Sequence, residues 1–98
     1  MSATLTVIYW RDIPAQVTAK GDGGSARSQL SDRFQQAIDA AAMKADLVEM
    51  DLYLEEWRQV ARPCGDDLEA EVAAEVERLE AAFTGDALRR LAGSGGQG

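Results

Sequence analysis

The sequence predicts a single α+β domain in which an N-terminal antiparallel β-hairpin packs against about three α-helices. Apolar and β-branched residues dominate the first twenty positions in short runs, as in strands, and from Ala26 onward they recur every three or four residues, as in helices. A chain of 98 residues is long enough for one domain. We expect that domain to span residues 1–92 and the glycine-rich residues 93–98 to form a mobile tail.

The predicted hairpin joins a strand over Thr4–Trp10 to a second strand over Ala15–Lys20. Pro14 cannot donate to a ladder, so it indicates a strand start or a sheet edge. Both faces of the first strand carry bulk: Leu5, Val7 and Tyr9 share one face, and Thr4, Thr6, Ile8 and Trp10 share the other. A strand of this kind is usually covered on both faces or lies at the centre of a sheet with more than two strands. The two predicted strands alone provide neither arrangement, which points to pairing with another chain.

Two helices are predicted next. Residues 21–24 (GDGG) form a turn, with Ser25 or Ser28 as a possible N-cap. One apolar helical face then follows: Leu30, Phe34, Ala37, Ile38, Ala41 and Ala45. A second helix carries Met50, Leu54, Trp57 and Ala61 and ends before Pro63. Trp57 is its largest anchor, so Trp57→Ala is expected to be among the costliest substitutions.

A third helix follows Asp66 or Asp67, either of which can cap it. Its apolar stripe is Leu68, Val72, Val76, Leu79 and Phe83. Acidic residues surround that stripe, as expected for a solvated amphipathic helix. Thr84-Gly85-Asp86 ends the helix and starts a short last turn through Ala87, Leu88 and Leu91.

Charge and cysteine content restrict the functional classes. Ten Lys and Arg against seventeen Asp and Glu give a net charge of -7, which opposes attachment to nucleic acid or to an anionic membrane surface. No apolar stretch is long enough for a membrane helix, and the first residues lack the cationic start of a signal peptide. With a single cysteine, Cys64, no internal disulfide can form, so we expect a cytoplasmic protein.

Three strings carry a family resemblance: "TVIYWRDIPAQV" (residues 6–17), "QLSDRFQQAIDAAAMKA" (29–45) and "YLEEWR" (53–58). Their combination resembles the small bacterial virulence-factor domain family, of the conserved-virulence-factor-C type. The resemblance implies no catalytic residue or ligand. In larger relatives the domain is fused to helical-repeat and iron–sulfur-scaffold-like domains, which implies a protein-contact role. Stand-alone versions beside genes of folate-linked and corrinoid-linked methyl metabolism imply a link to one-carbon chemistry.

No residue set has the pattern of a catalytic, cofactor-binding or metal site. Cys64 could act as a nucleophile, but the chain contains no histidine to activate it. Glu71 and Glu75 share a helix face and could bind a cation, although a solvated face is the favoured interpretation. The glycines of residues 21–24 lack a Walker lysine and the third glycine of a dinucleotide fingerprint, which favours a plain turn.

The group Tyr9, Trp10, Arg11 and Asp12 allows two interpretations. Aromatics beside an arginine at a strand end can stack a planar ligand. Alternatively, Trp10 belongs to the core and Arg11 pairs with an acid, the candidates being Asp12, Glu55 and Glu56. The second interpretation is favoured because a chain with two tryptophans usually buries them.

These observations predict a non-enzymatic, cytoplasmic accessory or protein-interaction module with no cofactor. It would bind a protein partner or a second copy through the hairpin edge, using Tyr9, Trp10, Arg11, Asp12 and Val17. The alternative is a small ligand-binding or enzyme-associated subunit in one-carbon or corrinoid methyl metabolism. That subunit would hold an anionic or planar ligand between Tyr9, Arg11 and the glycine turn.

Overall fold

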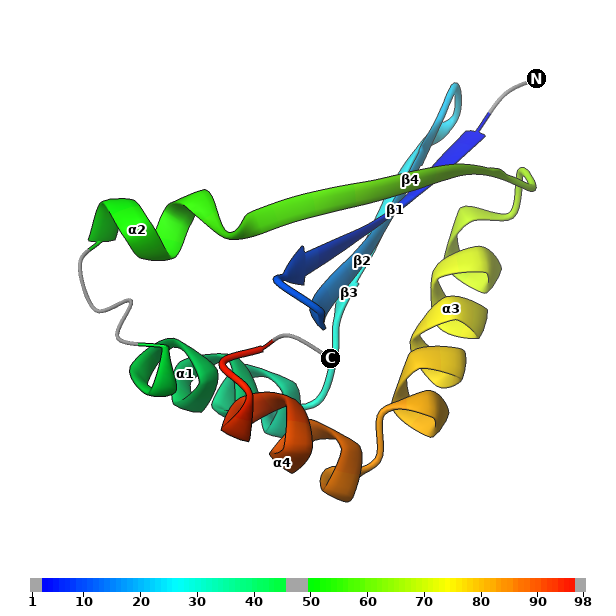
Figure 1. Cartoon of the computed structure of the whole chain (residues 1–98). Helices are drawn as coiled ribbons and strands as arrows, with labels where there is room; N and C mark the ends of the chain where they lie inside the picture. The colour runs from blue at the N-terminus through cyan, green and yellow to red at the C-terminus, as the bar shows by residue number, and fades with distance from the viewer. Residues whose placement is uncertain (1–2, 46–49, 97–98) are drawn as a thin grey trace.

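The computed structural model describes residues 3–45 and 50–96. Four strands form one antiparallel sheet in the order β3-β2-β1-β4 (Figure 1). The strands are β1 (Ala3–Trp10), β2 (Ile13–Gly21), β3 (Gly24–Gln29) and β4 (Trp57–Cys64). The helices are α1 (Asp32–Lys44), α2 (Met50–Glu55), α3 (Leu68–Ala82) and α4 (Gly85–Gly93). The predicted α+β class is confirmed, with a sheet of four strands instead of two.

The predicted hairpin is present, and its two strands lie in the middle of the sheet. Val7 of β1 pairs with Val17 of β2 on one side and with Val60 of β4 on the other. The tight turn between β1 and β2 places Arg11 at a φ of 54°, in the left-handed region that few side chains adopt. Both edges of β1 are paired within this chain, but its second face is not fully covered: Trp10 is buried, whereas Thr4, Thr6 and Ile8 line an open surface.

Residues 24–29 form the strand β3 and do not start a helix. Gly24 has a φ of 142°, a backbone conformation that would be strained for any residue with a side chain. This glycine closes the turn that joins β2 to β3. Ser25 and Ser28 therefore do not cap α1, contrary to prediction. Ser31 is the N-cap, and its N–H and hydroxyl both donate to the Glu80 carboxylate, at 2.7 and 2.9 Å.

The largest correction concerns residues 57–64, which form an edge strand in place of the predicted end of a second helix. The helix α2 ends at Glu55, and Trp57 begins β4 opposite Trp10. The apolar spacing from Leu54 to Ala61 imitated a helical face. Pairing with β1 along the whole strand stabilises the extended form, and β propensity is set largely by such neighbours.

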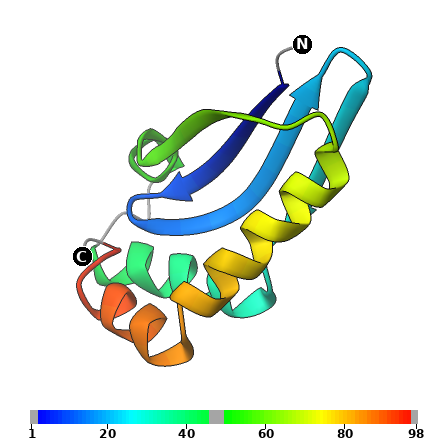
Figure 2. The same ribbon diagram turned by 90° about the vertical axis from the view of Figure 1, so that its right-hand side faces the viewer.

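The core lies between the sheet and the helices (Figure 2). The stripes of α1 and α3 are confirmed at Phe34 and Ile38 of α1 and at Val72 and Leu79 of α3, all buried. Asp67 caps α3 and accepts from the Ala70 N–H at 3.2 Å. In Figure 2 α3 runs across β2 and β3, its main strand contacts, and α1 packs beside α4. No helix in the described ranges is long and apolar enough to cross a membrane.

Candidate functional site

Trp10 lies at the end of β1 and is fully buried, so the core interpretation of this side chain is confirmed. Its indole N–H donates to the Tyr53 carbonyl at 2.9 Å, and the two rings stack with centroids 5.5 Å apart. A buried indole N–H needs such a partner. Trp10 therefore ties α2 to the sheet and presents no surface to a ligand or protein.

Arg11 holds the hairpin turn to two other parts of the chain. Its guanidinium pairs with Glu56 at 2.7 Å, one of the predicted partners, and donates to the Gly95 carbonyl at 2.9 Å. The Asp12 N–H donates to the Gly96 carbonyl at 2.9 Å. Gly95 and Gly96 are buried, so the expected free tail is not observed at these two positions. Gln97 and Gly98 lie outside the described residues.

Val17 is fully buried on an inner strand, so its prediction as a sheet-edge contact is wrong. It pairs with Val7 on one side and Ser28 on the other. The hairpin has no free edge, since β3 and β4 flank it. Pro14 is buried at the start of β2 and does not mark an edge.

The open edge nearest to hydrophobic surface is β4. The Arg11 N–H donates to the Glu56 carbonyl at 3.1 Å, which fixes the phase of the ladder between β1 and β4. In an antiparallel ladder alternate residues point their amides away from the partner strand. The amides of Trp57, Gln59 and Ala61 therefore face outward, and Pro63 occupies the next outward position, where its missing N–H costs nothing.

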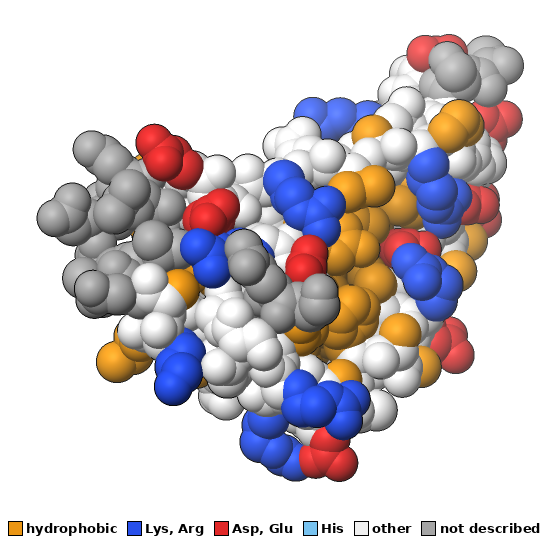
Figure 3. Space-filling view, in the orientation of Figure 1, with side chains coloured by type: hydrophobic (Ala, Val, Ile, Leu, Met, Phe, Trp, Pro, Cys, Tyr) orange, Lys and Arg blue, Asp and Glu red, His pale blue; other side chains and the backbone are white. Residues whose placement is uncertain are grey.

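An apolar strip runs beside this edge on the helix side of the sheet. We define it as Tyr9, Val60 and Cys64, which project from β1 and β4 and are half-buried or exposed. Val60 is 46% exposed, a large fraction for a valine next to the core. Figure 3 shows hydrophobic side chains gathered below β4 between basic ones. The strip remains open because the main contacts of α3 are with β2 and β3.

Arginines frame the strip. The Arg58 guanidinium lies 4.7 Å from the centre of the Tyr9 ring and pairs with Asp12 at 3.2 Å. Arg62 and Arg78 both bind the Glu75 carboxylate, Arg62 at 3.3 Å. The prediction of a solvated face fails at Glu75, which is only 5% exposed.

Glu75 is charged in this setting. Hydrogen bonds from Arg78 hold the pKa of Glu75 below its ordinary value of 4.5, against an opposing effect of burial, and Arg62 adds to the lowering. The same contact raises the pKa of Arg78. One carboxylate thus joins α3 to β4 through two guanidinium groups, and the trio keeps one net positive charge at neutral pH.

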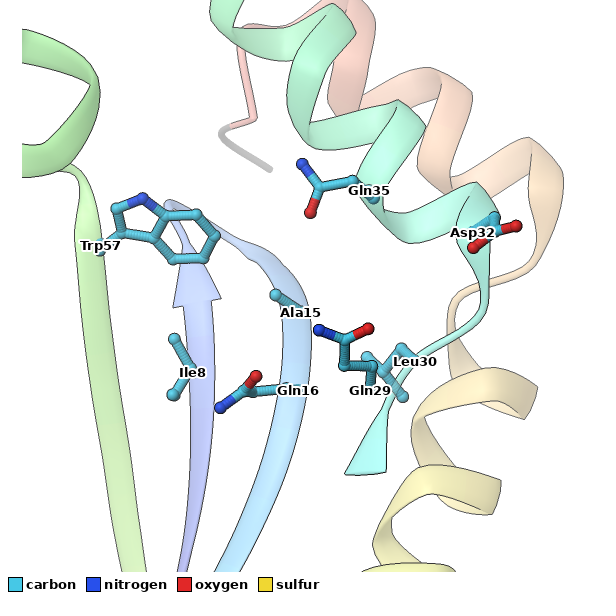
Figure 4. A pocket seen from close by; sticks show the side chains of 8 residues that line it. All are labelled: Ile8, Ala15, Gln16, Gln29, Leu30, Asp32, Gln35 and Trp57. Atoms are coloured by element: carbon cyan, nitrogen blue, oxygen red, sulfur yellow. The ribbon is translucent and has the colours of Figure 1, made fainter. Parts of the chain in front are cut away.

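The opposite face of the sheet carries a cavity of about 430 Å³ (Figure 4). It is lined by Ile8, Ala15, Gln16, Gln29, Leu30, Asp32, Gln35 and Trp57. Trp57, predicted as a core anchor, is only half-buried and borders this cavity. Sequence reasoning missed the site, although the alternation of Thr4, Thr6 and Ile8 marked a second face of β1.

Other predicted groups are not assembled into a site. Arg11 and the glycine turn stand at opposite ends of β2, whose nine residues span about 27 Å, so they cannot share a small ligand. Tyr9 faces the helix side under Arg58. Cys64 is half-buried at the end of β4, and the described residues contain no group of three or more His, Cys, Asp or Glu able to hold a metal.

Fold and surfaces together define a small α+β domain whose antiparallel sheet is packed by helices on one face and open over much of the other. The chain belongs to the virulence-factor family, whose model matches residues 8–92. Neither a curated protein nor a solved structure gives a significant match. The resemblance of the N-terminal strings is therefore confirmed over most of the chain.

Proposed function

We propose that this chain is a non-enzymatic, cytoplasmic protein-interaction module that binds a partner strand along β4. One observation carries the proposal: no strand of the described residues pairs with the outer edge of β4, and this edge lies directly beside the apolar strip, where Val60 is 46% exposed. An extended segment added to such an edge gains backbone hydrogen bonds, and alternate side chains find a pocket or strip that provides specificity.

The other free edge, β3, is a weaker candidate. Its six residues, GSARSQ, include no large apolar side chain, and α3 packs on the helix side of the strand. A strand added there would gain main-chain bonds without burying apolar surface, which is the main source of association energy. β4 offers both an eight-residue edge and uncovered hydrophobic side chains.

The arginines beside the apolar strip indicate what the partner segment should contain. Arg62 and Arg78 share a single carboxylate, and both side chains are at least half exposed. Such guanidinium groups retain free donors for another carboxylate. The partner segment should therefore carry apolar residues at alternate positions, to cover Tyr9 and Val60, and an acidic residue opposite Arg62.

Outward-facing amides allow a sharp test. Ala61→Pro removes an amide that points away from β1 and so blocks strand addition without removing a bond of the existing ladder. Val60→Asp places a charge in the apolar strip. Ser25→Pro is the matched control, because it removes an outward-facing amide on the other edge strand, β3. The direction of this amide follows from the hydrogen bond that the Leu30 N–H donates to the Ala15 carbonyl, which shows which residues of β3 bond to β2.

The experiment is cross-linked affinity capture from the native host with quantitative mass spectrometry, preceded by sedimentation of the purified chain to detect self-pairing. We expect one partner, or a second copy, to bind the wild type and Ser25→Pro and to be lost with both Ala61→Pro and Val60→Asp. A partner retained by both β4 variants would overturn the proposal. A monomeric chain that captures nothing dependent on β4 would overturn it as well.

A further inference from the structure

We propose that the open face of the sheet is a nucleotide-binding site, in which the base lies in the cavity beside Trp57 and Ile8 and the phosphate reaches Arg27 and Lys20. This site is separate from the apolar strip, because its side chains project from the other face of the strands. It therefore stands independently of the proposed function.

The cavity suits a planar heterocycle. Its apolar surface comes from Ile8, Ala15, Leu30 and the half-buried indole of Trp57. Figure 4 shows the Trp57 indole above Ile8, the Gln16 amide extending toward Ile8 and the Gln29 amide extending toward Ala15. A volume of about 430 Å³ is within the range of small-molecule sites, and stacking on an aromatic face is available to any base.

Hydrogen-bonding groups around the cavity match the edge of a base. Amide side chains offer a donor and an acceptor together, which pairs with the alternating donors and acceptors of a heterocycle. Gln16 and Gln29 have no hydrogen bond from their side-chain amides to any other described residue, so both are available. The Asp32 carboxylate at the border accepts from an exocyclic amine and disfavours a phosphate at this end.

A second hollow continues the site along the sheet. It has a volume of about 350 Å³ and shares Ile8 and Gln16 with the first. Its further lining residues are Thr4, Thr6, Thr18, Lys20, Arg27 and Gln59. The two hollows thus form one trough, which carries the Trp57 indole and one carboxylate, Asp32, in its first hollow and is cationic at the Lys20 end.

The spacing of the two ends fits a nucleotide. Arg27 of β3 pairs with Thr18 of β2, and Thr18 lies two residues along the strand from Gln16. The cross-strand pair Thr18–Arg27 is therefore about 7 Å from the pair Gln16–Gln29. Lys20 lies a further two residues along the strand, another 7 Å or so. Neither cation forms an ion pair with a described residue, and both are exposed. These distances are on the scale that separates a base from its 5′-phosphates.

A free nucleotide fits better than a polynucleotide. The trough holds two cations, whereas the chain as a whole carries a net charge of -7, which repels a long phosphate backbone. The threonine hydroxyls between the two ends can bond the ribose, since a hydroxyl both donates and accepts.

The test is an NMR titration of the full chain with adenosine 5′-monophosphate, with adenosine and with a six-nucleotide single-stranded DNA. We expect the monophosphate to shift the Trp57 indole and the amides of Ile8, Gln16 and Gln29. Arg27→Ala should weaken monophosphate binding about tenfold and leave adenosine binding nearly unchanged, because only the phosphate meets this side chain. Arg89→Ala, at an exposed position of α4, is the matched control and should change neither monophosphate binding nor adenosine binding.

The proposal fails if millimolar monophosphate shifts no resonance of the open face, or if Arg27→Ala weakens binding no more than Arg89→Ala does. An affinity for the monophosphate equal to or greater than that for the oligonucleotide supports a free nucleotide as the ligand. A much tighter oligonucleotide, still sensitive to Arg27→Ala, supports the same site with single-stranded nucleic acid as the source.

Discussion

Among the described residues, Glu75 is the one buried carboxylate. It connects the helix α3 to the strand β4, which are otherwise joined mainly through the rest of the sheet. Its guanidinium partners come from β4 and from its own helix, α3. A buried charge is costly unless it is paired and hydrogen-bonded, and Glu75 meets both conditions. The trio therefore fixes the distance between α3 and β4, which sets the width of the apolar strip.

Glu75→Gln should lower the free energy of unfolding by about 1–2 kcal/mol at pH 7, because charge-assisted bonds become neutral ones. The stabilisation from Glu75 is complete above the ordinary pKa of 4.5 and is lost as the pH falls through the lower native pKa. Urea unfolding of both proteins between pH 7 and pH 3 should show the difference shrinking toward the acid end. Glu77→Gln, exposed on the same helix, is the control and should be near neutral.

Gly96→Ala should destabilise the fold by about 1–3 kcal/mol, since the residue has a φ of 89° and an added Cβ would lie 3.0 Å from the Trp10 ring. Gly93→Ala, which meets no atom within 4 Å, should be neutral or slightly stabilising. Thermal unfolding of the two variants measures the contrast. Equal midpoints would mean that Gly95 and Gly96 do not hold the hairpin turn in solution.

Residue-level reasoning succeeded where a side chain's chemistry dictates its surroundings. Trp10 is buried with its N–H satisfied, and Arg11 pairs with Glu56, one of three acids considered. The prediction that Trp57 anchors the core was wrong, because the sequence spacing of a large apolar residue does not distinguish a core position from the border of a cavity. The amides of Gln16 and Gln29 gave no signal in a single sequence, since they meet only when β2 and β3 pair.

At the scale of elements, β4 determines which surfaces of the molecule are free. It covers the edge of β1, and its own outer edge and part of its helix-side face remain open. Charged side chains and Pro63 limit uncontrolled pairing of this edge, as in many natural edge strands. These features are compatible with the proposed pairing of β4 with one matching segment.

Proline substitutions should report the position of each strand. Ala61→Pro should cost little stability, because that amide faces outward, whereas Val60→Pro should cost several kcal/mol by removing a bond to β1 and distorting the strand. Val17→Pro should prevent folding, since β2 is paired on both sides. Circular dichroism with urea unfolding ranks the three. A stable Val17→Pro protein would contradict the strand order.

Helices α1 and α3 could be predicted because each carries an apolar stripe, and Asp67 also marked the start of α3. The start of α1 was misplaced at Ser25 or Ser28, and the nine-residue helix α4 was predicted only as a short last turn after Thr84. The strand β3 could not be predicted, since GSARSQ has neither β-branched nor aromatic residues. The strand β4 was obscured by Arg, Gln and Ala, which favour helices. Both strands form through pairing with residues distant in sequence, and local propensity does not contain that information.

At the scale of the whole molecule, the sheet separates the two surfaces for which we propose binding. The helix side bears the apolar strip beside the β4 edge, and the open side bears the trough that ends at Trp57. Trp57 is the first residue of β4, so a ligand at the cavity would touch the strand for which we propose partner binding. The sequence predicted an interaction module but placed its edge on the wrong strand, because the strand order depends on β4.

Residue-resolved amide exchange on the isolated chain tests the central claim that β4 is the open edge. The account predicts fast exchange at Gln59 and Ala61, whose amides face outward, and slow exchange at Arg58, Val60 and Arg62, whose amides bond to β1. Amides of β2 should all be protected. Equal protection along the whole of β4, or rapid exchange in β2, would contradict the strand order and the docking edge built on it.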